Sequence, residues 1–416
     1  MSNLAVHAAF TQTQRLRRHQ FKRVLRRTEV RVGDSRSVQR LSLSSAGYLY
    51  KREGAGDRQQ ASAGTEERSL RVTPDQLVIN PMWLTGGSIA VSKLHGAVSP
   101  DYRVFKASRD QLYPRYLHHL LRSQPYRDQY NLFVRANTTF DRRIQQDDLD
   151  QLPLWLPEVV EQRRIADFLD DRVARIDQII TARRTQIAAV REHWALELEW
   201  VLGSISETTR ASRVLRVMPG FAFPSEAYSE DPSDRRLLRG VNVAVGSTRW
   251  DEVVYWPEDR VDEVGEFVLG AGDLVLGMDR PWIGDGLRIA RVTEDDGSPL
   301  LLQRVAKLAS DVLDSEYLFW AYQSRRFRDQ VELDLTGLSV PHLSGDQIGS
   351  FDIPVCDAHR QAAVVRALNA GTESVSRLIN AIGASIGRLD EYKQSLITAA
   401  VTGDIDVTAA GGGTPG

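Results

Sequence analysis

Two stretches of the chain decide its organisation, because the second repeats the first. Residues 152–165 read LPLWLPEVVEQRRI, and residues 351–364 read FDIPVCDAHRQAAV. At a constant offset, Gln162 falls on Gln361 and Ile165 falls on Val364. Apolar positions then coincide for about 40 residues, and self-similarity of this extent indicates an internal duplication.

Both stretches continue into apolar stripes that recur every seven residues. The stripe residues are Leu169, Val173, Ile176, Ile180, Ile187, Val190 and Trp194 in the first copy, and Leu368, Val375, Ile379, Ile382, Ile386 and Leu389 in the second. Such a pattern, kept over four or more heptads, predicts two long helices of the coiled-coil type. Glu197 continues the first series as an imperfect seam residue. Gly383 and Gly387 suggest a close helix approach in the second copy.

The segments that precede the two helices also match each other. Tyr126-Arg127-Asp128-Gln129 corresponds to Phe327-Arg328-Asp329-Gln330, while the sequences around these anchors diverge. We expect strands at 78–79, 88–91, 103–105, 273–276, 288–292 and 304–308, and single helices at 113–129 and 315–330. The predicted fold is α+β, with two globular α/β segments separated by two long helices in a pseudo-two-fold repeat. The predicted boundaries are 1–151, 152–204, 205–350, 351–407 and a disordered tail at 408–416.

Composition narrows the class of protein. A length of 416 residues predicts two or three domains at roughly 150 residues each. The single cysteine, Cys356, excludes an intramolecular disulfide framework and a cysteine-cluster metal site. A single cysteine fits the reducing cytoplasm, where we expect the protein, and no apolar run reaches the length of a membrane span. Residues 1–150 hold 25 Lys and Arg against 14 Asp and Glu, whereas residues 205–350 hold 16 against 25. The basic first segment points to a polyanionic partner.

Motifs for catalysis are missing from the sequence. It has no phosphate-binding Gly loop, and Asn80-Pro81-Met82-Trp83 lacks the central proline of the active-site tetrapeptide of amino methyltransferases. Glu391-Tyr392-Lys393 resembles some nuclease sites but lies on the helical seam without an acidic partner, and Thr336-Gly337-Leu338-Ser339 has no nearby base. His118-His119 occupies adjacent positions of one helix and is not spaced as a metal site. We expect a binding subunit with no catalytic residue, no metal and no cofactor of its own.

Lysine and arginine side chains are the candidates for DNA contact, because cations neutralise phosphates and Arg can also bind guanine edges. The candidates in the first segment are Arg15, Arg18, Lys22, Arg23, Lys51, Arg52, Arg58, Lys93, Arg135, Arg142 and Arg143. Those in the second are Arg235, Arg236, Arg239, Arg249, Arg280, Arg288 and Arg304. Any one of them can instead form a surface ion pair.

The repeated elements resemble the DNA specificity subunits of type I restriction–modification enzymes. The resemblance is carried by residues 161–169 (EQRRIADFL) with Arg175-Ile176-Asp177, by residues 96–102 (GAVSPDY), and by residues 389–407 (LDEYKQSLITAAVTGDIDV). It extends over about residues 20–407. These elements in duplicate are specific to that family.

The resemblance implies a function and partners. Two target recognition domains would each read one half of a bipartite, asymmetric site in double-stranded DNA. The two helical repeats would pair antiparallel as a spacer and dock two copies of an adenine methyltransferase subunit. That partner would bind S-adenosylmethionine, and a translocating nuclease subunit would join for restriction.

Two other readings stay open at this point. A self-sufficient methyltransferase or nuclease would modify DNA without a partner. A helical scaffold between two proteins would show no sequence-selective DNA binding, even in a complex.

Overall fold

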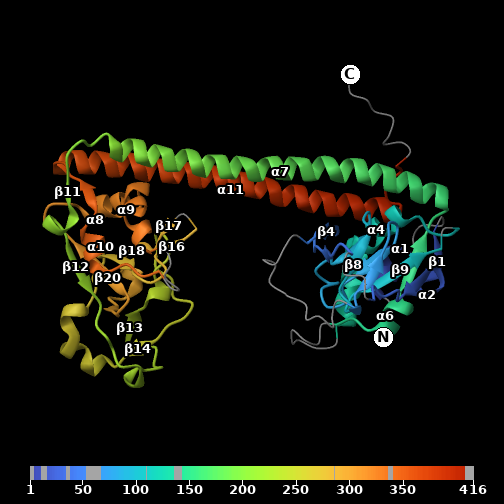
Figure 1. Ribbon diagram of the computed structural model, residues 1–416, viewed down its shortest axis with the longest axis horizontal. Coiled ribbons are helices and arrows are strands. Elements are labelled where there is room, and N and C mark those ends of the chain that lie inside the picture. Colours follow the sequence, from blue (N-terminus) through green and yellow to red (C-terminus); the bar gives the residue numbers. More distant parts are fainter. Residues whose placement is uncertain are drawn as a thin grey trace. The chain divides into compact units, whose positions relative to one another are not determined.

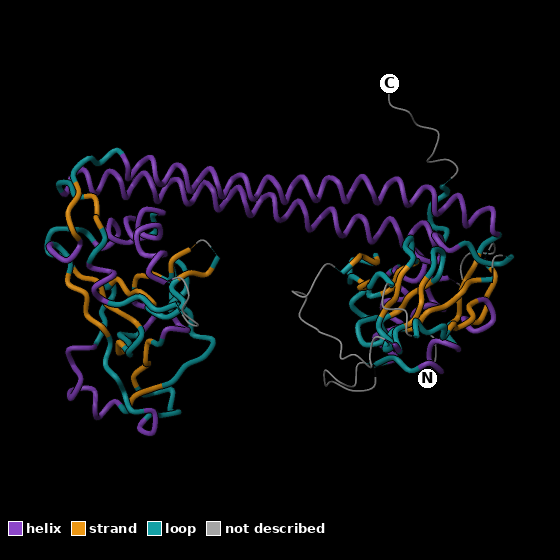
Figure 2. The backbone as a smooth tube through the Cα atoms, viewed as in Figure 1, coloured by secondary structure: helices purple, strands orange, loops and turns teal. Residues whose placement is uncertain are grey.

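The computed structural model describes residues 4–10, 16–33, 38–52, 67–108, 110–134, 143–284, 286–335 and 341–407. The chain divides into two compact units, and each unit combines segments that are distant in sequence. Unit 1 comprises residues 1–184 and 383–416, and unit 2 comprises residues 185–382. The architecture mixes helices and strands, as the repeat predicts (Figure 2).

Two helices of 45 residues each, α7 (Val159–Gly203) and α11 (Ala358–Thr402), confirm the two predicted long helices (Figure 1). They run antiparallel in both units. In unit 2, Arg360 bonds the hydroxyl of Ser204, and the ring of Trp194 lies against Gly371. In unit 1, Lys393 Nζ lies 2.8 Å from Asp177 Oδ1.

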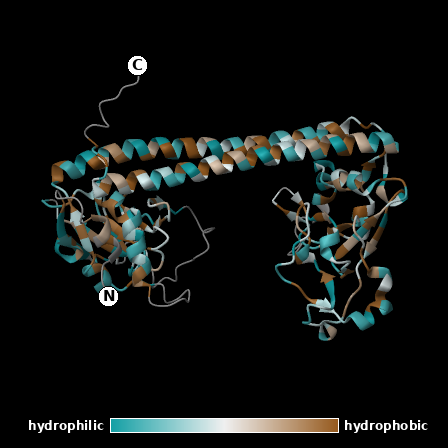
Figure 3. Ribbon diagram, turned by 180° about the vertical axis from the view of Figure 1, so that it is seen from behind, coloured by the Kyte–Doolittle hydropathy of each residue, from teal (hydrophilic) through white to brown (hydrophobic). Residues whose placement is uncertain are grey.

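The stripe residues named from the sequence all lie on the buried or half-buried side of α7 and α11. The hydropathy along both helices alternates accordingly (Figure 3). Glu197, the imperfect member of the first series, is exposed, and Leu198 and Leu202 are buried in its place. Beyond Trp194 the buried positions therefore advance in four-residue steps, which offset the drift of a strict seven-residue repeat relative to a straight helix of 3.6 residues per turn.

The expected close approach at Gly383 and Gly387 is wrong. A β-carbon at either position would meet no atom within 4 Å. The close approach occurs at Gly371, where a β-carbon would overlap the indole of Trp194. A glycine pair in the sequence does not show which helix face it occupies, and here both glycines are exposed.

Each unit contains a four-stranded antiparallel sheet, and the strand order is the same in both. In unit 1 the order is β2 (Leu25–Thr28), β9 (Arg103–Ala107), β6 (Leu77–Ile79), β7 (Ile89–Val91). In unit 2 it is β12 (Arg216–Pro219), β20 (Val305–Ala309), β15 (Leu274–Gly277), β18 (Ile289–Arg291). One central strand of each sheet, β6 or β15, is buried along its whole length and apolar on both faces, so each sheet is covered on both sides there.

A short antiparallel pair precedes each long helix and repeats between the units. It consists of β1 (Arg17–Gln20) with β10 (Pro153–Leu156) in unit 1, and of β11 (Thr208–Arg210) with β21 (Asp352–Pro354) in unit 2. The other strands diverge. Unit 1 has β3 (Leu41–Leu43) with β4 (Leu49–Lys51), and β5 (Leu70–Val72) with β8 (Gly96–Val98). Unit 2 has β13 (Arg235–Leu238) between β14 (Tyr255–Trp256) and β19 (Leu300–Leu301), and β16 (Trp282–Ile283) with β17 (Gly286–Leu287).

Each predicted single helix is in fact two helices. Unit 1 has α4 (Pro114–Arg122) and α5 (Gln124–Phe133), and unit 2 has α8 (Ser315–Tyr322) and α9 (Arg325–Leu335). Ser123 and Ser324 lie at the two breaks, and each donates its hydroxyl to the carbonyl three residues earlier. Such a bond competes with the helical ladder. The remaining helices are α1 (Leu4–Phe10), α2 (Phe21–Val24), α6 (Gln146–Asp150), α10 (Gly345–Gly349) and the 3-10 turns η1 (Ala211–Arg213), η2 (Ser225–Ala227), η3 (Gly240–Asn242), η4 (Glu258–Phe267) and η5 (Glu294–Asp296).

The main core of each unit joins the globular body to both long helices. In unit 1, Tyr116 and Tyr126 pack in one cluster with Leu169 of α7 and Ile397 of α11. In unit 2, the corresponding cluster joins Tyr317 and Phe327 to Leu202 of α7 and Leu368 of α11. No helix in the described part of the chain is long and apolar enough to cross a membrane.

Candidate nucleic-acid interface

In each unit, one buried glutamine fixes the globular body to its long helix, and the two glutamines make the same three hydrogen bonds. In unit 1, the side chain of Gln162 accepts from the Tyr113 amide (2.8 Å) and donates to the carbonyls of Gln111 and Pro157 (2.9 Å each). It has no exposed surface.

Gln361 makes the equivalent contacts in unit 2. It accepts from the Asp314 amide (2.8 Å) and donates to the carbonyls of Val312 (3.1 Å) and Cys356 (2.8 Å). We call these two sites the glutamine clamps. They show that the duplication extends to individual buried hydrogen bonds.

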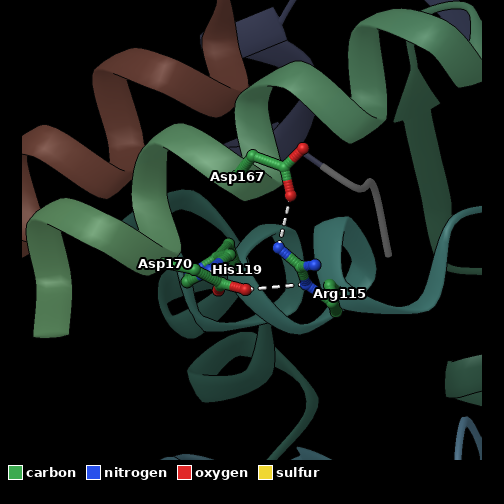
Figure 4. Close-up of polar contacts among 4 residues, drawn as sticks. All are labelled: Arg115, His119, Asp167 and Asp170. Atoms are coloured by element: carbon green, nitrogen blue, oxygen red, sulfur yellow. Dashed lines mark hydrogen bonds and ion pairs between the residues drawn. The ribbon is translucent and has the colours of Figure 1, made fainter.

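Two turns further along the long helices, the two units differ. In unit 1, Arg115 of α4 pairs with Asp167 and Asp170 of α7, and His119 Nε2 lies 2.7 Å from Asp170 Oδ1 (Figure 4). Burial raises the pKa of Asp170, but bonds and charge from His119 and Arg115 outweigh it and lower the pKa overall. The carboxylate is therefore held in its charged form.

The repeat-related contact in unit 2 is neutral. Trp320 Nε1 donates to Asn369 Oδ1 at 3.0 Å, in place of the His119–Asp170 pair. The scaffold is thus conserved in geometry between the two copies while its side-chain chemistry has diverged.

The basic residues predicted for unit 1 fall into two groups. Arg18, Lys22, Arg23, Lys51 and Lys93 are exposed, Arg52 is half-buried, and Arg143 is exposed beside Asp101 (3.3 Å). Arg15, Arg58, Arg135 and Arg142 lie outside the described residues. Two arginines that the sequence did not single out have structural positions: buried Arg103 donates to the Ile144 carbonyl, and half-buried Arg122 donates to the Gly87 carbonyl. Burial lowers the pKa of both to about 10.

Four of the arginines predicted for unit 2 contact protein groups. Arg235 makes two bonds to the carboxylate of Glu258, and Arg239 bonds the carbonyl of Glu252. Arg236 bonds the carbonyl of Asp295 and stacks on the ring of Trp250. Arg288 donates to the carbonyls of Val243 and Asp279 at 2.9 Å each. These contacts hold loops together and leave fewer donors for a ligand.

The other three predicted arginines of unit 2, Arg249, Arg280 and Arg304, are exposed. Two of them lie beside Asp279: Arg304 Nη1 is 3.9 Å from its carboxylate, and Arg280 follows it in sequence. Arg249 lies near Arg288, which donates to the Asp279 carbonyl. Burial lowers the pKa of Arg288, and the nearby charge of Arg249 lowers it further. We call Asp279 and the three arginines beside it, Arg280, Arg288 and Arg304, the Asp279 cluster. The cluster is cationic, although the overall charge of unit 2 is acidic.

Unit 1 presents a different surface at the comparable place. Tyr48 and Tyr50 are exposed with ring centroids 6.1 Å apart, and Tyr102 lies near Tyr50, Arg52 and Asn80. The sequence did not single out this aromatic group, because its members come from two segments that are distant in the chain, Tyr48-Leu49-Tyr50 and Tyr102. In the described ranges, no group of three or more His, Cys, Asp or Glu is placed to hold a metal.

Comparisons with known proteins give two sequence relatives, and no protein-family model matches the chain. The EcoAI type I restriction enzyme specificity subunit of Escherichia coli is 31% identical over 175 residues, which is 41% of this chain and 29% of the relative. The MjaVIII specificity subunit of Methanocaldococcus jannaschii is 24% identical over 279 residues, which is 62% of this chain and 63% of the relative. The chain thus spans less than two thirds of each curated relative.

Solved structures match nearly the full length. A chain from a type I R-M system, studied for its complex assembly and conformational transition, has a TM-score of 0.72 at 17% identity and is covered to 99%. The HsdS subunit of Thermoanaerobacter tengcongensis has a TM-score of 0.50 at 17% identity and is covered to 98%. Both matches cover 94% of this chain and show a shared fold. Together, the sequence relatives and the fold confirm that this chain resembles the specificity subunits of type I restriction enzymes.

Proposed function

We propose that this chain is the DNA-recognition subunit of a type I restriction–modification complex, acting on DNA in the cytoplasm. Each unit reads one half of a bipartite, asymmetric site in double-stranded DNA. One observation carries the proposal: the two units share strand order, glutamine clamps and helix pairing, but differ in exposed side chains. A duplicated frame with diverged surfaces suits two different half-sites.

The chain's own part in the reaction is recognition and positioning. The sequence has no phosphate-binding loop or catalytic constellation, which supports a non-catalytic role. S-adenosylmethionine would be bound by the partner methyltransferase subunit, which takes the target adenine out of the stack. A nuclease subunit would join the complex for restriction.

Two repeat-related apolar residues support the docking of two methyltransferase copies. Ile179 on α7 in unit 1 and Leu378 on α11 in unit 2 are 46% and 48% exposed. Exposed aliphatic side chains at the same place in two copies of a helix suit two equivalent protein contacts.

This docking can be tested by stoichiometry. Ile179→Asp and Leu378→Asp should each remove one of two bound methyltransferase subunits, measured by mass photometry, and the double variant should remove both. Gln178→Asp, at an exposed position next to Ile179, is the matched control. Two copies bound by the double variant would contradict the proposed site.

Recognition itself is tested by mapping methylated bases in DNA from a methylation-free host. The host would express this chain, the cognate methyltransferase subunit, or both. We expect a split, non-palindromic adenine-methylated motif only with both. Methylation by this chain alone would contradict the non-catalytic role. With both subunits present, the absence of any motif would favour the scaffold alternative.

A further inference from the structure

The loops at one edge of the two sheets occupy the same topological place but carry different chemistry. In unit 1, β6 pairs with β9 so that Ile79 faces Arg103, and Asn80 and Tyr102 are the next residues outward. In unit 2, β15 pairs with β20 so that Gly277 faces Val305, and Met278 and Arg304 follow. The Asn80 and Tyr102 side chains lie close together, and the Met278 amide donates to the Arg304 carbonyl at 2.9 Å.

The backbone of unit 2 is strained at this place. Among the described non-glycine residues, positive φ angles occur at Asp75, Arg280, Ser298 and Arg304. Arg280 has φ 45° and Arg304 has φ 73°, and both belong to the Asp279 cluster. A left-handed backbone favours Gly, and among other residues it favours Asn or Asp. Two arginines in this conformation indicate that their side chains are needed there.

Surrounding contacts hold both arginines in place. The Arg280 amide donates to the Pro341 carbonyl at 2.8 Å, and Arg288 holds the Asp279 carbonyl. His342 Nδ1 lies 2.7 Å from Asp279 Oδ1, the oxygen that Arg304 approaches. Among the described residues, the Arg280 guanidinium makes no hydrogen bond or ion pair, and more than half of the Arg304 side chain is exposed. Both guanidinium groups are therefore positioned with donors left for a ligand.

We propose that Arg280 and Arg304 determine specificity by reading a guanine in the half-site of unit 2. This inference rests on the proposed function. A guanidinium matches the O6 and N7 acceptors of guanine in the major groove, and a rigid backbone fixes its approach. The equivalent place in unit 1 presents Asn80 and Tyr102, so the guanine contact belongs to one half-site only.

Glycine substitutions test the proposal without unfolding the chain. Arg280→Gly and Arg304→Gly remove the side chains and suit the positive φ, so the melting temperature should stay equal or rise. Ser298→Gly, at φ 51° in the same unit, is the matched control. Each protein is expressed with the methyltransferase subunit, and its methylated motif is mapped.

We expect each arginine variant to accept other bases at one G·C position of one half-site, with discrimination reduced about 10-fold to 100-fold. The other half-site and the Ser298→Gly motif should stay unchanged. An unchanged motif, a uniform loss at all sequences, or a lowered melting temperature in the arginine variants would overturn the assignment. If the unsubstituted chain produces no bipartite motif with its partner, the proposed function itself fails.

Discussion

Replacing Gln162 by leucine tests whether the glutamine clamp holds a globular body to its helix. The leucine keeps the volume roughly but removes three hydrogen bonds made by a fully buried side chain. Three bonds at about 1 kcal/mol each give a loss of about 3 kcal/mol. The buried Pro157 carbonyl is left without its partner, which adds roughly 1–2 kcal/mol. We therefore expect the free energy of unfolding of unit 1 to fall by about 3–5 kcal/mol.

Hydrogen exchange followed by mass spectrometry in increasing urea would locate this loss, since one global midpoint is not well defined for a two-unit chain. Gln162→Leu should lower protection in α4 and the start of α7, whereas Gln361→Leu should act on unit 2. Gln178→Leu, at an exposed position of α7, should change stability by about 0.5 kcal/mol or less. A loss below about 1 kcal/mol for Gln162→Leu, or equal losses in both units, would refute the clamp.

Three further predictions follow from the helices. Gly371→Ala should destabilise unit 2 by about 1–3 kcal/mol, because the added methyl group would overlap Trp194. Gly383→Ala should stabilise the chain by roughly 0.5–1 kcal/mol, because alanine favours the helix and the position is open. Thermal melts that rank the two variants in the reverse order would contradict this packing. Asp170→Asn should cost stability at neutral pH, because the lowered pKa of Asp170 means that its charged form stabilises the fold above about pH 4. That contribution disappears as pH falls through the lowered pKa, so the stabilities of the wild type and the Asp170→Asn variant should converge in acid. A stability difference between the two proteins that stays constant with pH, measured by denaturation, would exclude this role. A seven-residue insertion in both α7 and α11 should lengthen the gap in the methylated motif, and an unchanged gap would exclude a spacer role.

The repeated elements were predictable from the sequence because they are constrained by burial. Apolar residues at heptad spacing predicted α7 and α11, and short apolar runs predicted three of the four strands in each main sheet, with β2 and β12 missed. The helix breaks at Ser123 and Ser324 were missed. A serine hydroxyl can bond a backbone carbonyl one turn earlier with or without interrupting the helix, so the residue alone does not predict a break. What the heptad pattern did not predict is the burial of Leu198 and Leu202, because a strict heptad does not follow the turn of a straight helix.

The DNA-contact candidates were harder to predict. The net charge indicated that basic residues are concentrated in the first segment. Whether a given arginine contacts protein groups or is available for DNA depends on neighbours that are distant in sequence. Arg235 and Arg288 contact protein groups, whereas Arg280 and Arg304 extend from a strained loop. Only the folded chain brings Asp279, Arg304 and His342 together.

The most direct test of the account is an exchange of residues 205–350 for the corresponding segment of a chain with another specificity. The chimaera would be expressed with the methyltransferase subunit, and its methylated motif would be mapped against that of the parent. We predict that one half-site changes, while the other half-site and the gap stay the same. A change in both half-sites, or in neither, would contradict independent reading by two units on one frame.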